Sequence, residues 1–361
     1  MLCVFLVMKK IILVSNYSGL YGSELMLEKL YLSLKDDYEV KTYLNEAIPV
    51  PEEFSSSINA VTNRFNVVSK NNKRISLSSL MFWLKVFVKD KPDLVIVNIS
   101  LIPEVFLATK ALRIKSMVFV RESLIDYKHF FGIYERYLKL FCDCVVSNSR
   151  YTSSMFSKLD SMVISDCIDL PEKSIKIRLG VVPKFGYLGR MSLRKGVITL
   201  LSALNDSVNR PFELHLIGDK LSSDALFDEQ YEELIRRLRL KGNLIIEHGF
   251  LSNPFEIVEK CDFMVAPSIL PETFGLSVLE CLSVGVPVIA SNIGAYPELV
   301  SKNNGFTFFP NDSVDLGAKL NIALSYEGDD YASLSENAIF SAESYGFLVY
   351  RNNILRLVKN V

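Results

Sequence analysis

The chain has 361 residues, too many for one comfortable hydrophobic core, so we expect two domains of ordinary size. Apolar residues make up 49% and charged residues 22%, a composition that excludes a disordered chain. Lys and Arg number 40 against 41 Asp and Glu, so the overall charge predicts no nucleic-acid partner.

The amino terminus is apolar but too short to cross a membrane. Lys9 and Lys10 separate the run MLCVFLV from IILV, and neither run approaches the ~18 residues of a membrane span. The positive charge follows the apolar run, whereas in a signal peptide it precedes that run. We therefore expect a cytoplasmic protein whose first strand follows Met8, and any membrane contact would be peripheral, at the inner face.

The metal-binding residue types show no ligand spacing. Six cysteines are scattered along the chain, and we expect them to be buried, reduced thiols. The three histidines also lie far apart. The sequence therefore predicts no metal site.

Short apolar runs alternate with amphipathic stretches in the first half, a pattern typical of a parallel sheet with helices on both faces. Residues 69–79 (SKNNKRISLSS) are polar and basic and are expected to form an exposed loop. The expected strands are residues 10–15, 38–44, 94–98, 117–121 and 144–147.

The alternation loosens over residues 160–183, which we interpret as a linker, and then restarts. The predicted fold class is α/β, with Rossmann-like domains at residues 1–170 and 180–343. A final helix within residues 344–361 is long enough to return to the first domain. The expected strands of the second domain are residues 184–188, 212–217, 244–248, 263–266, 286–290 and 307–309.

The most informative segment, residues 267–300, follows the apolar run FMVAP. Its loop therefore leaves the carboxyl end of a strand, where open α/β sheets place ligands. Gly275 permits close backbone approach before a predicted helix that runs to about residue 283. The amides of Phe274, Gly275 and Leu276 would be unpaired donors at the amino terminus of that helix, which suits a phosphate.

Two carboxylates accompany this loop. Glu272 lies within it, and Glu280 follows on a strongly apolar helix. A carboxylate can accept hydrogen bonds from both hydroxyls of a ribose diol. A solvated helical glutamate is the alternative for Glu280, although a glutamate among apolar neighbours usually needs a partner.

Two cations share an earlier loop. Gly189-Arg190 ends an expected strand and a helix starts near Gly196, so Arg190 and Lys195 lie on one strand-to-helix connection. Two cations over a helix amino terminus can clamp an anion, and arginine supplies a bidentate fork. Solvated surface cations are the alternative, but the loop position and the flanking glycines favour phosphate binding.

These motifs, in order along residues 184–300, resemble the retaining glycosyltransferases of family 4, also called group 1 glycosyltransferases. The resemblance rests on the Arg-x4-Lys loop, the Ile217-Gly218 turn and the segment from Pro267-Ser268 through Glu272 to Glu280. It is weaker but continuous through the first half. It implies the GT-B fold, in which two Rossmann-like domains with parallel sheets face each other across a cleft.

The resemblance also implies roles. Arg190 and Lys195 would hold the diphosphate of a nucleotide-sugar donor on the loop that starts at Gly189. Glu272 would contact the sugar hydroxyls and Glu280 the ribose. The remaining donor contacts would be backbone amides of Phe274, Gly275 and Leu276.

In the first half, the loop containing Gly19, Gly22 and Ser23 occupies the place of the family's glycine-rich loop on the acceptor side. Its glycines are not adjacent, and a plain structural turn is the alternative. Family members often carry a histidine after the strand near residue 120, where this chain has Arg121 and Glu122. These two residues are either a replacement polar pair at the site or a strand-end ion pair.

The expected chemistry is transfer of a sugar to a saccharide or lipid-linked acceptor. No Asp-x-Asp pair is present, so we expect no divalent metal and no other cofactor. The resemblance implies retention of anomeric configuration, and analogy implies surface polysaccharide biosynthesis. The alternatives are a nucleotide-sugar epimerase or another enzyme on the GT-B fold, and a non-catalytic binding protein.

Aromatic and basic residues cluster in the first domain and offer a membrane hypothesis. They are Phe82, Trp83, Lys85, Phe87 and Lys89, with a second group from Lys128 to Lys139. An amphipathic, basic helix could lie on an anionic membrane near a lipid-linked acceptor. The alternative, which is more common for such a stripe, is that it packs into the core on one side and meets solvent on the other.

Overall fold

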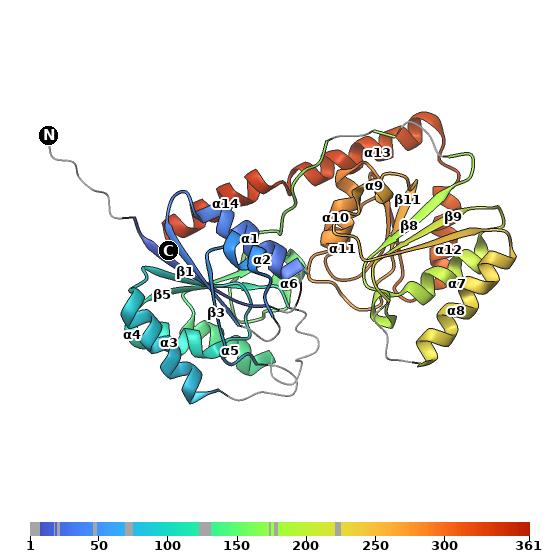
Figure 1. The fold of residues 1–361 in the computed structure, drawn as a ribbon. Helices are drawn as coiled ribbons and strands as arrows, with labels where there is room; N and C mark the ends of the chain where they lie inside the picture. The colour runs from blue at the N-terminus through green and yellow to red at the C-terminus, as the bar shows by residue number, and fades with distance from the viewer. Residues whose placement is uncertain are drawn as a thin grey trace. The chain divides into compact units, whose positions relative to one another are not determined.

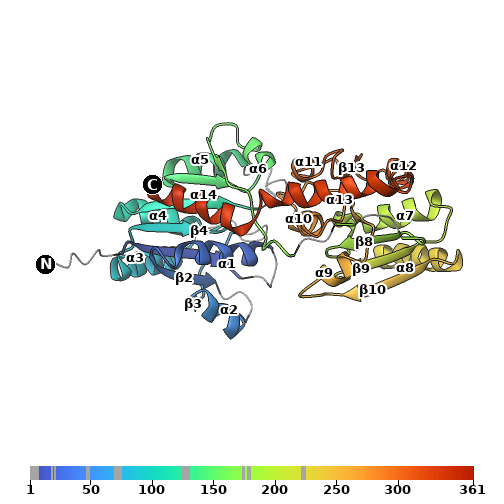
Figure 2. The ribbon, with the colours of Figure 1, turned by 90° about the horizontal axis from the view of Figure 1, so that it is seen from above.

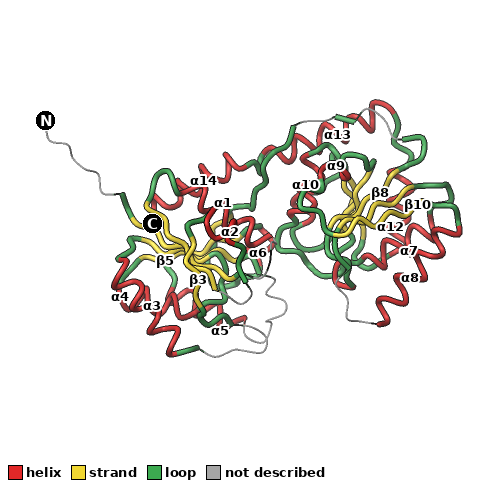
Figure 3. Tube along the Cα trace, viewed as in Figure 1, coloured by secondary structure: helices red, strands yellow, loops and turns green. Residues whose placement is uncertain are grey.

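The computed structural model of the protein describes residues 8–17, 19, 22–45, 49–68, 75–122, 131–172, 175–176, 180–220 and 225–361. The chain forms two compact units (Figure 1). Unit 1 comprises the residues up to Cys167 together with Phe347–Val361, and unit 2 comprises Ile168–Gly346. In both units, helices alternate with strands along the chain (Figure 3).

Unit 1 contains a seven-stranded sheet in the order β3-β2-β1-β4-β5-β6-β7, and every neighbouring pair is parallel. Two of its strands were not predicted, β3 and β7. Both lie at edges of the sheet and carry few buried apolar side chains, so the sequence gives little signal for them. The strands are β1 (Lys10–Asn16), β2 (Glu39–Asn45), β3 (Ala60–Asn63), β4 (Leu94–Val97), β5 (Lys115–Val120), β6 (Cys144–Ser147) and β7 (Met162–Val163).

Helices cover both faces of this sheet. Helices α3, α4 and α5 lie on one face, and α1 and α14 lie on the other, where they pack side by side (Figures 1 and 2). The helices of unit 1 are α1 (Gly22–Leu34), α2 (Glu52–Ser57), α3 (Leu77–Asp90), α4 (Pro103–Leu112), α5 (Phe131–Phe141), α6 (Arg150–Ser154) and α14 (Phe347–Asn360).

The start of α3 corrects the predicted loop at residues 69–79. The helix begins at Leu77, because the Ser76 hydroxyl accepts a hydrogen bond from the Ser79 amide (3.3 Å) and caps the first turn. Residues 69–74 of that expected loop lie outside the described residues. Trp83 and Phe87 on α3 are fully buried in the core of unit 1, which supports the core interpretation of the aromatic stripe.

Unit 2 contains a six-stranded parallel sheet in the order β10-β9-β8-β11-β12-β13. Its strands are β8 (Lys184–Leu188), β9 (Glu213–Ile217), β10 (Leu244–Gly249), β11 (Phe263–Ala266), β12 (Val288–Ser291) and β13 (Gly305–Phe308). Its helices are the 3₁₀ turn η2 (Leu193–Lys195), α7 (Val197–Ser207), α8 (Ala225–Leu240), α9 (Phe255–Val258), α10 (Leu276–Ser283), α11 (Tyr296–Leu299), α12 (Ser313–Ala323) and α13 (Gly328–Glu343).

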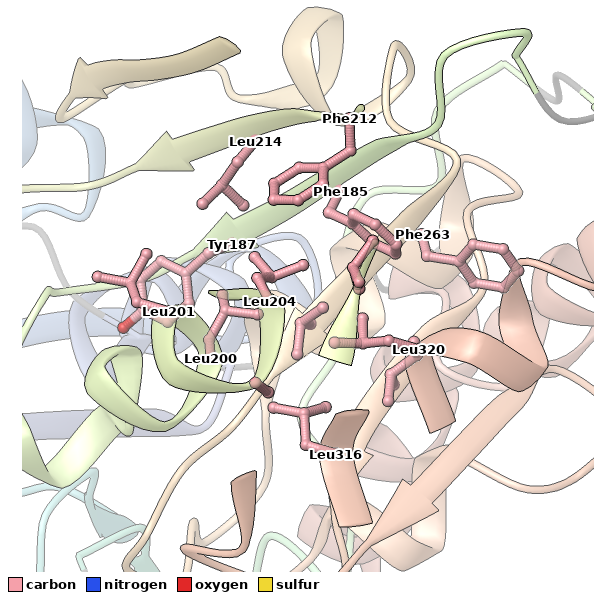
Figure 4. Close-up of a cluster of buried hydrophobic side chains, with 14 of the residues drawn as sticks. Phe185, Tyr187, Leu200, Leu201, Leu204, Phe212, Leu214, Phe263, Leu316 and Leu320 are labelled. Carbon is pink, nitrogen blue, oxygen red and sulfur yellow. The ribbon is translucent and has the colours of Figure 1, made fainter. Parts of the chain in front are cut away.

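The central strands of unit 2 are largely buried on both faces, because helices cover both faces of the sheet. Phe185, Leu214 and Leu216 belong to one core cluster, with side chains from α7 and α12 (Figure 4). Ile217 and Met264 point into a second cluster built on α10 and α13. Full burial of a side chain such as Phe185 contributes about 1.5–3 kcal/mol relative to leaving it exposed.

The predicted final helix within residues 344–361 corresponds to α14, and a separate helix, α13, precedes it. α13 packs against α10 in unit 2, whereas α14 packs against α1 in unit 1. Residues 344–346 separate them, and the Tyr345 carbonyl accepts a hydrogen bond from the Ile168 amide (3.1 Å).

Two further sequence expectations concern cysteines and membrane spans. The five cysteines among the described residues are free thiols, of which Cys167, Cys261 and Cys281 are buried and Cys142 and Cys144 are half-buried. Cys3 lies outside the described residues. No helix in the described part of the chain has both the length and the apolarity that a bilayer span requires.

Candidate functional site

The topology of unit 2 creates a switch point between β8 and β11. The chain passes from β8 outward to β9 on one side, and β11 adds to the other side of β8. Loops that leave these two strands diverge at their carboxyl ends, and open α/β sheets bind ligands at this place. The loop after β8 carries Arg190 and Lys195, and the loop after β11 carries Glu272.

The two loops are joined by an ion pair. Lys195 Nζ lies 2.9 Å from Glu272 Oε1, and both side chains are about one-quarter exposed. Ser268 donates a hydrogen bond from its hydroxyl to the same carboxylate oxygen (3.2 Å). The Ser268 hydroxyl is also 3.2 Å from the hydroxyl of Tyr296 on α11. The structure thus brings the predicted pair together and adds Ser268 and Tyr296, which sequence reasoning did not assign to the site.

Backbone contacts also hold the two loops next to each other. The Ile269 amide donates to the Arg194 carbonyl (2.9 Å). Gly196 has φ = 71°, and a Cβ at this position would lie 1.8 Å from the Pro267 carbonyl oxygen. Only glycine allows this approach. Gly196, which flanks the predicted cation loop, is therefore required for the close packing of the two loops.

Arg190 lies at the start of the same loop and is exposed. Its carbonyl accepts a hydrogen bond from the hydroxyl of Tyr187 (2.7 Å), which anchors the loop to β8. The adjacent Gly189 donates its amide to the Ile217 carbonyl (2.9 Å) and so ties the loop to β9. The exposed Arg190 is thus carried by a fixed backbone.

Gly275 caps the amino terminus of α10 and has φ = 118°. A Cβ there would lie 2.8 Å from the Tyr296 ring, so the loop packs against α11 only because Gly275 has no side chain. The amides at the start of α10, including that of Leu276, lack intrahelical acceptors. Phe274 is buried against Tyr345, so only its backbone faces the loop.

Glu280 lies on α10 and is partly buried. Burial raises the pKa of its carboxyl to about 7. None of the described residues donates a hydrogen bond to this carboxylate. A buried carboxylate without a donor is costly to ionise, and a ligand with hydroxyl groups would relieve that cost.

The glycine-rich loop of unit 1 leaves the carboxyl end of β1, at the switch point between β1 and β4. Gly19 has φ = 130° and Gly22 begins α1. The Ser23 carbonyl accepts a hydrogen bond from the Asn98 side chain (2.9 Å), which joins this loop to the end of β4. Residues 18 and 20–21 lie outside the described residues.

Arg121 is not part of an exposed polar pair with Glu122. Its guanidinium forms an ion pair with Asp166, and both side chains are only 5% exposed. It also donates to the Asn98 side-chain oxygen (3.2 Å) and to the Tyr350 hydroxyl on α14 (3.4 Å). Arg121 therefore links the ends of β4 and β5 to α14 inside unit 1.

Glu122 has other side-chain partners, although its carboxylate also accepts a hydrogen bond from the Arg121 backbone amide (3.1 Å). Its carboxylate accepts hydrogen bonds from the Ser100 amide (2.6 Å) and the Ser100 hydroxyl (2.8 Å). Burial raises the pKa of Glu122, and the hydrogen bonds from Ser100 oppose that rise. Sequence reasoning considered an Arg121–Glu122 pair because the two are adjacent. Both residues follow the end of β5 at Val120, and their side chains take different partners.

The described residues contain no group of three or more His, Cys, Asp or Glu side chains placed to hold a metal ion. His215 and His248 do lie together, because β9 and β10 are neighbours in the sheet. Their rings stack, and Nδ1 of His215 is 3.0 Å from Nε2 of His248. The sequence could not predict this contact, since the two histidines are distant in the chain.

Together, these observations define a two-domain α/β protein with Rossmann-like parallel sheets and a cation–carboxylate pair at a switch point. Residues 175–339 match the family model described as "Glycosyl transferases group 1". The predicted resemblance to the group 1 glycosyltransferases is therefore confirmed.

Two curated relatives illustrate the sequence similarity. The chain is 30% identical over 156 residues to a glycogen synthase of Mycobacterium tuberculosis, over 42% of this chain and 35% of the relative. It is 26% identical over 246 residues to the lipopolysaccharide core biosynthesis mannosyltransferase LpsB of Rhizobium meliloti, over 64% of this chain and 68% of the relative. The chain thus spans about a third of the first relative and about two thirds of the second.

The fold is similar along nearly the whole chain to a solved structure, Anabaena Alr3699/HepE in complex with UDP. The TM-score is 0.82 at 19% sequence identity, and the match covers 98% of this chain and 100% of the other. At this identity the likeness establishes the fold, and the predicted α/β fold of GT-B type is confirmed. The predicted facing of the two sheets across a cleft stays a prediction.

Proposed function

We propose that this protein is a retaining glycosyltransferase that moves a sugar from a nucleotide diphosphate donor to a saccharide or lipid-linked acceptor. The observation that carries the proposal is the Lys195–Glu272 pair (2.9 Å) at the switch point of unit 2, beside the start of α10. The group 1 family match and the UDP in the Anabaena complex support a nucleotide-sugar donor.

The pair suggests how the donor is received. In the structure, Glu272 neutralises Lys195. A diphosphate carries more negative charge than one carboxylate and competes for the ammonium group. The carboxylate released in this exchange can then accept hydrogen bonds from the sugar hydroxyls. When the donor binds, the Lys195–Glu272 contact is thus replaced by two contacts, one from Lys195 to the diphosphate and one from Glu272 to the sugar.

The difficult step is departure of the nucleoside diphosphate from the anomeric carbon. Negative charge grows on the leaving phosphate, so preorganised donors aimed at that phosphate lower the barrier. Arg190, Lys195 and the amides at the start of α10 are these donors in our proposal. The departing phosphate accepts the proton of the acceptor hydroxyl, and no divalent cation is required.

The setting we propose is the biosynthesis of a surface polysaccharide in the cytoplasm, with peripheral contact at the inner face of the membrane. The similarity to a lipopolysaccharide core mannosyltransferase supports an acceptor of this class. Glu280 would bind the ribose of the donor, since its buried carboxylate needs hydroxyl donors.

The test is a thermal-shift screen of nucleotide sugars with EDTA present, followed by transfer assays with the sugar that raises the melting temperature. We expect transfer with retained anomeric configuration, read by NMR. Lys195→Ala and Glu272→Ala should each lower kcat/KM by about a thousandfold. Both variants should stay folded, because exposed ion pairs contribute about 0–1 kcal/mol.

Lys302→Ala, at an exposed position of unit 2, is the matched control and should retain activity. Near-normal transfer by Lys195→Ala and Glu272→Ala would refute the assignment. Formation of an epimerised free nucleotide sugar without acceptor would indicate an epimerase. Loss of activity after EDTA treatment, restored by Mg²⁺, would contradict metal independence.

A further inference from the structure

Helices α3, α4 and α5 of unit 1 expose basic side chains and no free carboxylate. Their exposed cations are Lys85, Lys89, Lys110, Arg136 and Lys139. Only three carboxylates lie on these helices. Glu104 and Glu135 are buried and accept backbone amides, from Ser76 and Lys158 respectively. The whole chain carries a formal charge of −1, so this face departs strongly from the average.

The third carboxylate, Asp90, is already engaged. Lys41 Nζ lies 2.7 Å from its Oδ2, and the Tyr43 hydroxyl donates to the same oxygen (2.7 Å). The hydrogen bonds from Lys41 and Tyr43 outweigh the effect of burial and lower the pKa of Asp90. Its charge is thus compensated mainly on the sheet side, by Lys41 and Tyr43, with a smaller contribution from Lys89.

The same helices expose apolar side chains beside these cations. The exposed fractions range from 48% for Met81 to 73% for Leu77. Leu77, Met81 and Val88 fall within a narrow arc of α3, because residues 4 and 11 positions apart lie on one side of an α-helix. Lys85 and Lys89 border that arc. On α5, Ile133 and Leu140 are also exposed and are bordered by Arg136 and Lys139.

These helices share one face of unit 1. α3 packs against α4, α4 packs against α5, and all three cover the same core cluster (Figure 1). We name this surface the α3–α5 face, defined by Leu77, Met81, Val88, Ile133 and Leu140 with the five cations above. An apolar stripe bordered by cations fits the boundary between lipid head groups and acyl chains.

We propose that the α3–α5 face docks on an anionic lipid bilayer. Charge decides the occupant: a second copy of the chain would place cations against cations in a symmetric contact. A nucleic acid would match the charge but would leave the apolar side chains without a partner. An anionic bilayer surface satisfies both features.

The proposal deepens the proposed function, because it would place unit 1 beside a lipid-linked acceptor. The surface differs from the aromatic stripe considered from the sequence. Trp83 and Phe87 are core residues, and the exposed side chains are aliphatic. Of the second sequence cluster, residues 128–130 lie outside the described residues.

The experiment is flotation of the full chain with phosphatidylcholine vesicles, with and without phosphatidylglycerol. We expect binding only to the anionic vesicles, weakened by high salt. Each basic residue near an anionic surface strengthens binding by about fivefold. Loss of two of them in Lys85→Glu/Lys89→Glu should therefore lower the partition coefficient by roughly thirtyfold. Leu77→Ser/Val88→Ser should lower it by roughly tenfold and keep the salt dependence.

The control Arg210→Glu/Lys302→Glu makes the same charge change at exposed positions of unit 2 and should leave binding unchanged. Circular dichroism melts verify that all variants fold. Equal partition by the wild type and Lys85→Glu/Lys89→Glu would overturn the proposal. So would a dimer, or a nucleic-acid complex, that the α3 substitutions abolish while vesicle binding persists.

Vesicle binding needs neither donor nor acceptor, so Glu272→Ala should bind like the wild type. If transfer activity is absent but binding follows the predicted pattern, the surface assignment stands and the proposed function fails. If transfer proceeds but no variant affects vesicle binding, the proposed function stands and the surface assignment fails.

Discussion

The carboxyl ends of the two sheets use their charged residues in different ways. In unit 2, Lys195 and Glu272 pair while about one-quarter exposed, and Arg190 is exposed on the same loop. In unit 1, Arg121 and Asp166 pair at 5% exposure and are surrounded by Asn98 and Tyr350. The comparison teaches that an ion pair at a strand end is available to a ligand only if solvent reaches it.

Removal of Arg121 should have the largest effect on stability. Arg121→Met would leave Asp166 buried without its partner, and the free energy of unfolding should fall by about 3–5 kcal/mol. Urea denaturation followed by circular dichroism measures this change. Arg121→Met/Asp166→Asn should recover part of the loss, because no lone charge remains buried. A loss under about 1 kcal/mol for the single variant would mean that water reaches the pair.

Gly275→Ala should have an intermediate effect, now in unit 2. The new Cβ would meet the Tyr296 ring at 2.8 Å in a backbone conformation with φ = 118°. We expect a loss of about 1–3 kcal/mol in stability together with weaker donor binding, because the start of α10 must shift. Thermal unfolding and donor titration measure the two effects. Gly132→Ala on α5, where nothing lies within 4 Å of the new Cβ, is the control and should not destabilise the protein.

Glu280 should make donor binding depend on pH. Its pKa of about 7 lies above the usual range because burial disfavours the charged form. A bound ribose would donate hydrogen bonds to the carboxylate and favour ionisation, so binding should strengthen as pH rises through 7. We expect an affinity up to about tenfold lower at pH 6 than at pH 8, since one pH unit is a tenfold change in protonation. Calorimetric titration measures the donor affinity at each pH, and for Glu280→Gln this affinity should not change with pH. If the affinity of Glu280→Gln changed with pH as much as that of the wild type, Glu280 would not be the group responsible.

The smallest effect should come from the stacked histidines. Burial lowers the pKa of both His215 and His248, and the neighbouring His248 lowers that of His215 further. The unfolded chain therefore binds protons first as pH falls through about 6.5, and stability should decrease from there towards the lowered pKa values. Above that range the pair contributes no pH dependence. Melting temperatures at pH 7.5 and 5.5 test this, and His248→Gln should reduce the difference between them.

Much of unit 2 and its candidate site could be predicted from the sequence. The cation loop and the carboxylate loop each follow a continuous apolar strand and contain glycines, so their place at strand ends follows from local patterns. Ser268 was visible in the motif but had no assigned role. Its contact with Glu272 depends on how the loop folds back, which no periodicity encodes.

In unit 1, the sequence did not predict several contacts. Arg121 and Glu122 are adjacent in the sequence, yet their partners are Asp166 and Ser100. The strand β7 was also missed, because a two-residue strand carries no distinct pattern. Long-range pairing decided each of these features.

The sequence by itself determined the alternation of strands and helices, the fold class and the two loops with charged residues. These follow from local propensity and from the period of apolar residues, which need only neighbours in the chain. The tertiary structure decided which charges are exposed and which are buried, because burial depends on packing from distant segments. That difference separates the Lys195–Glu272 pair, which a ligand can reach, from the Arg121–Asp166 pair, which stabilises the core.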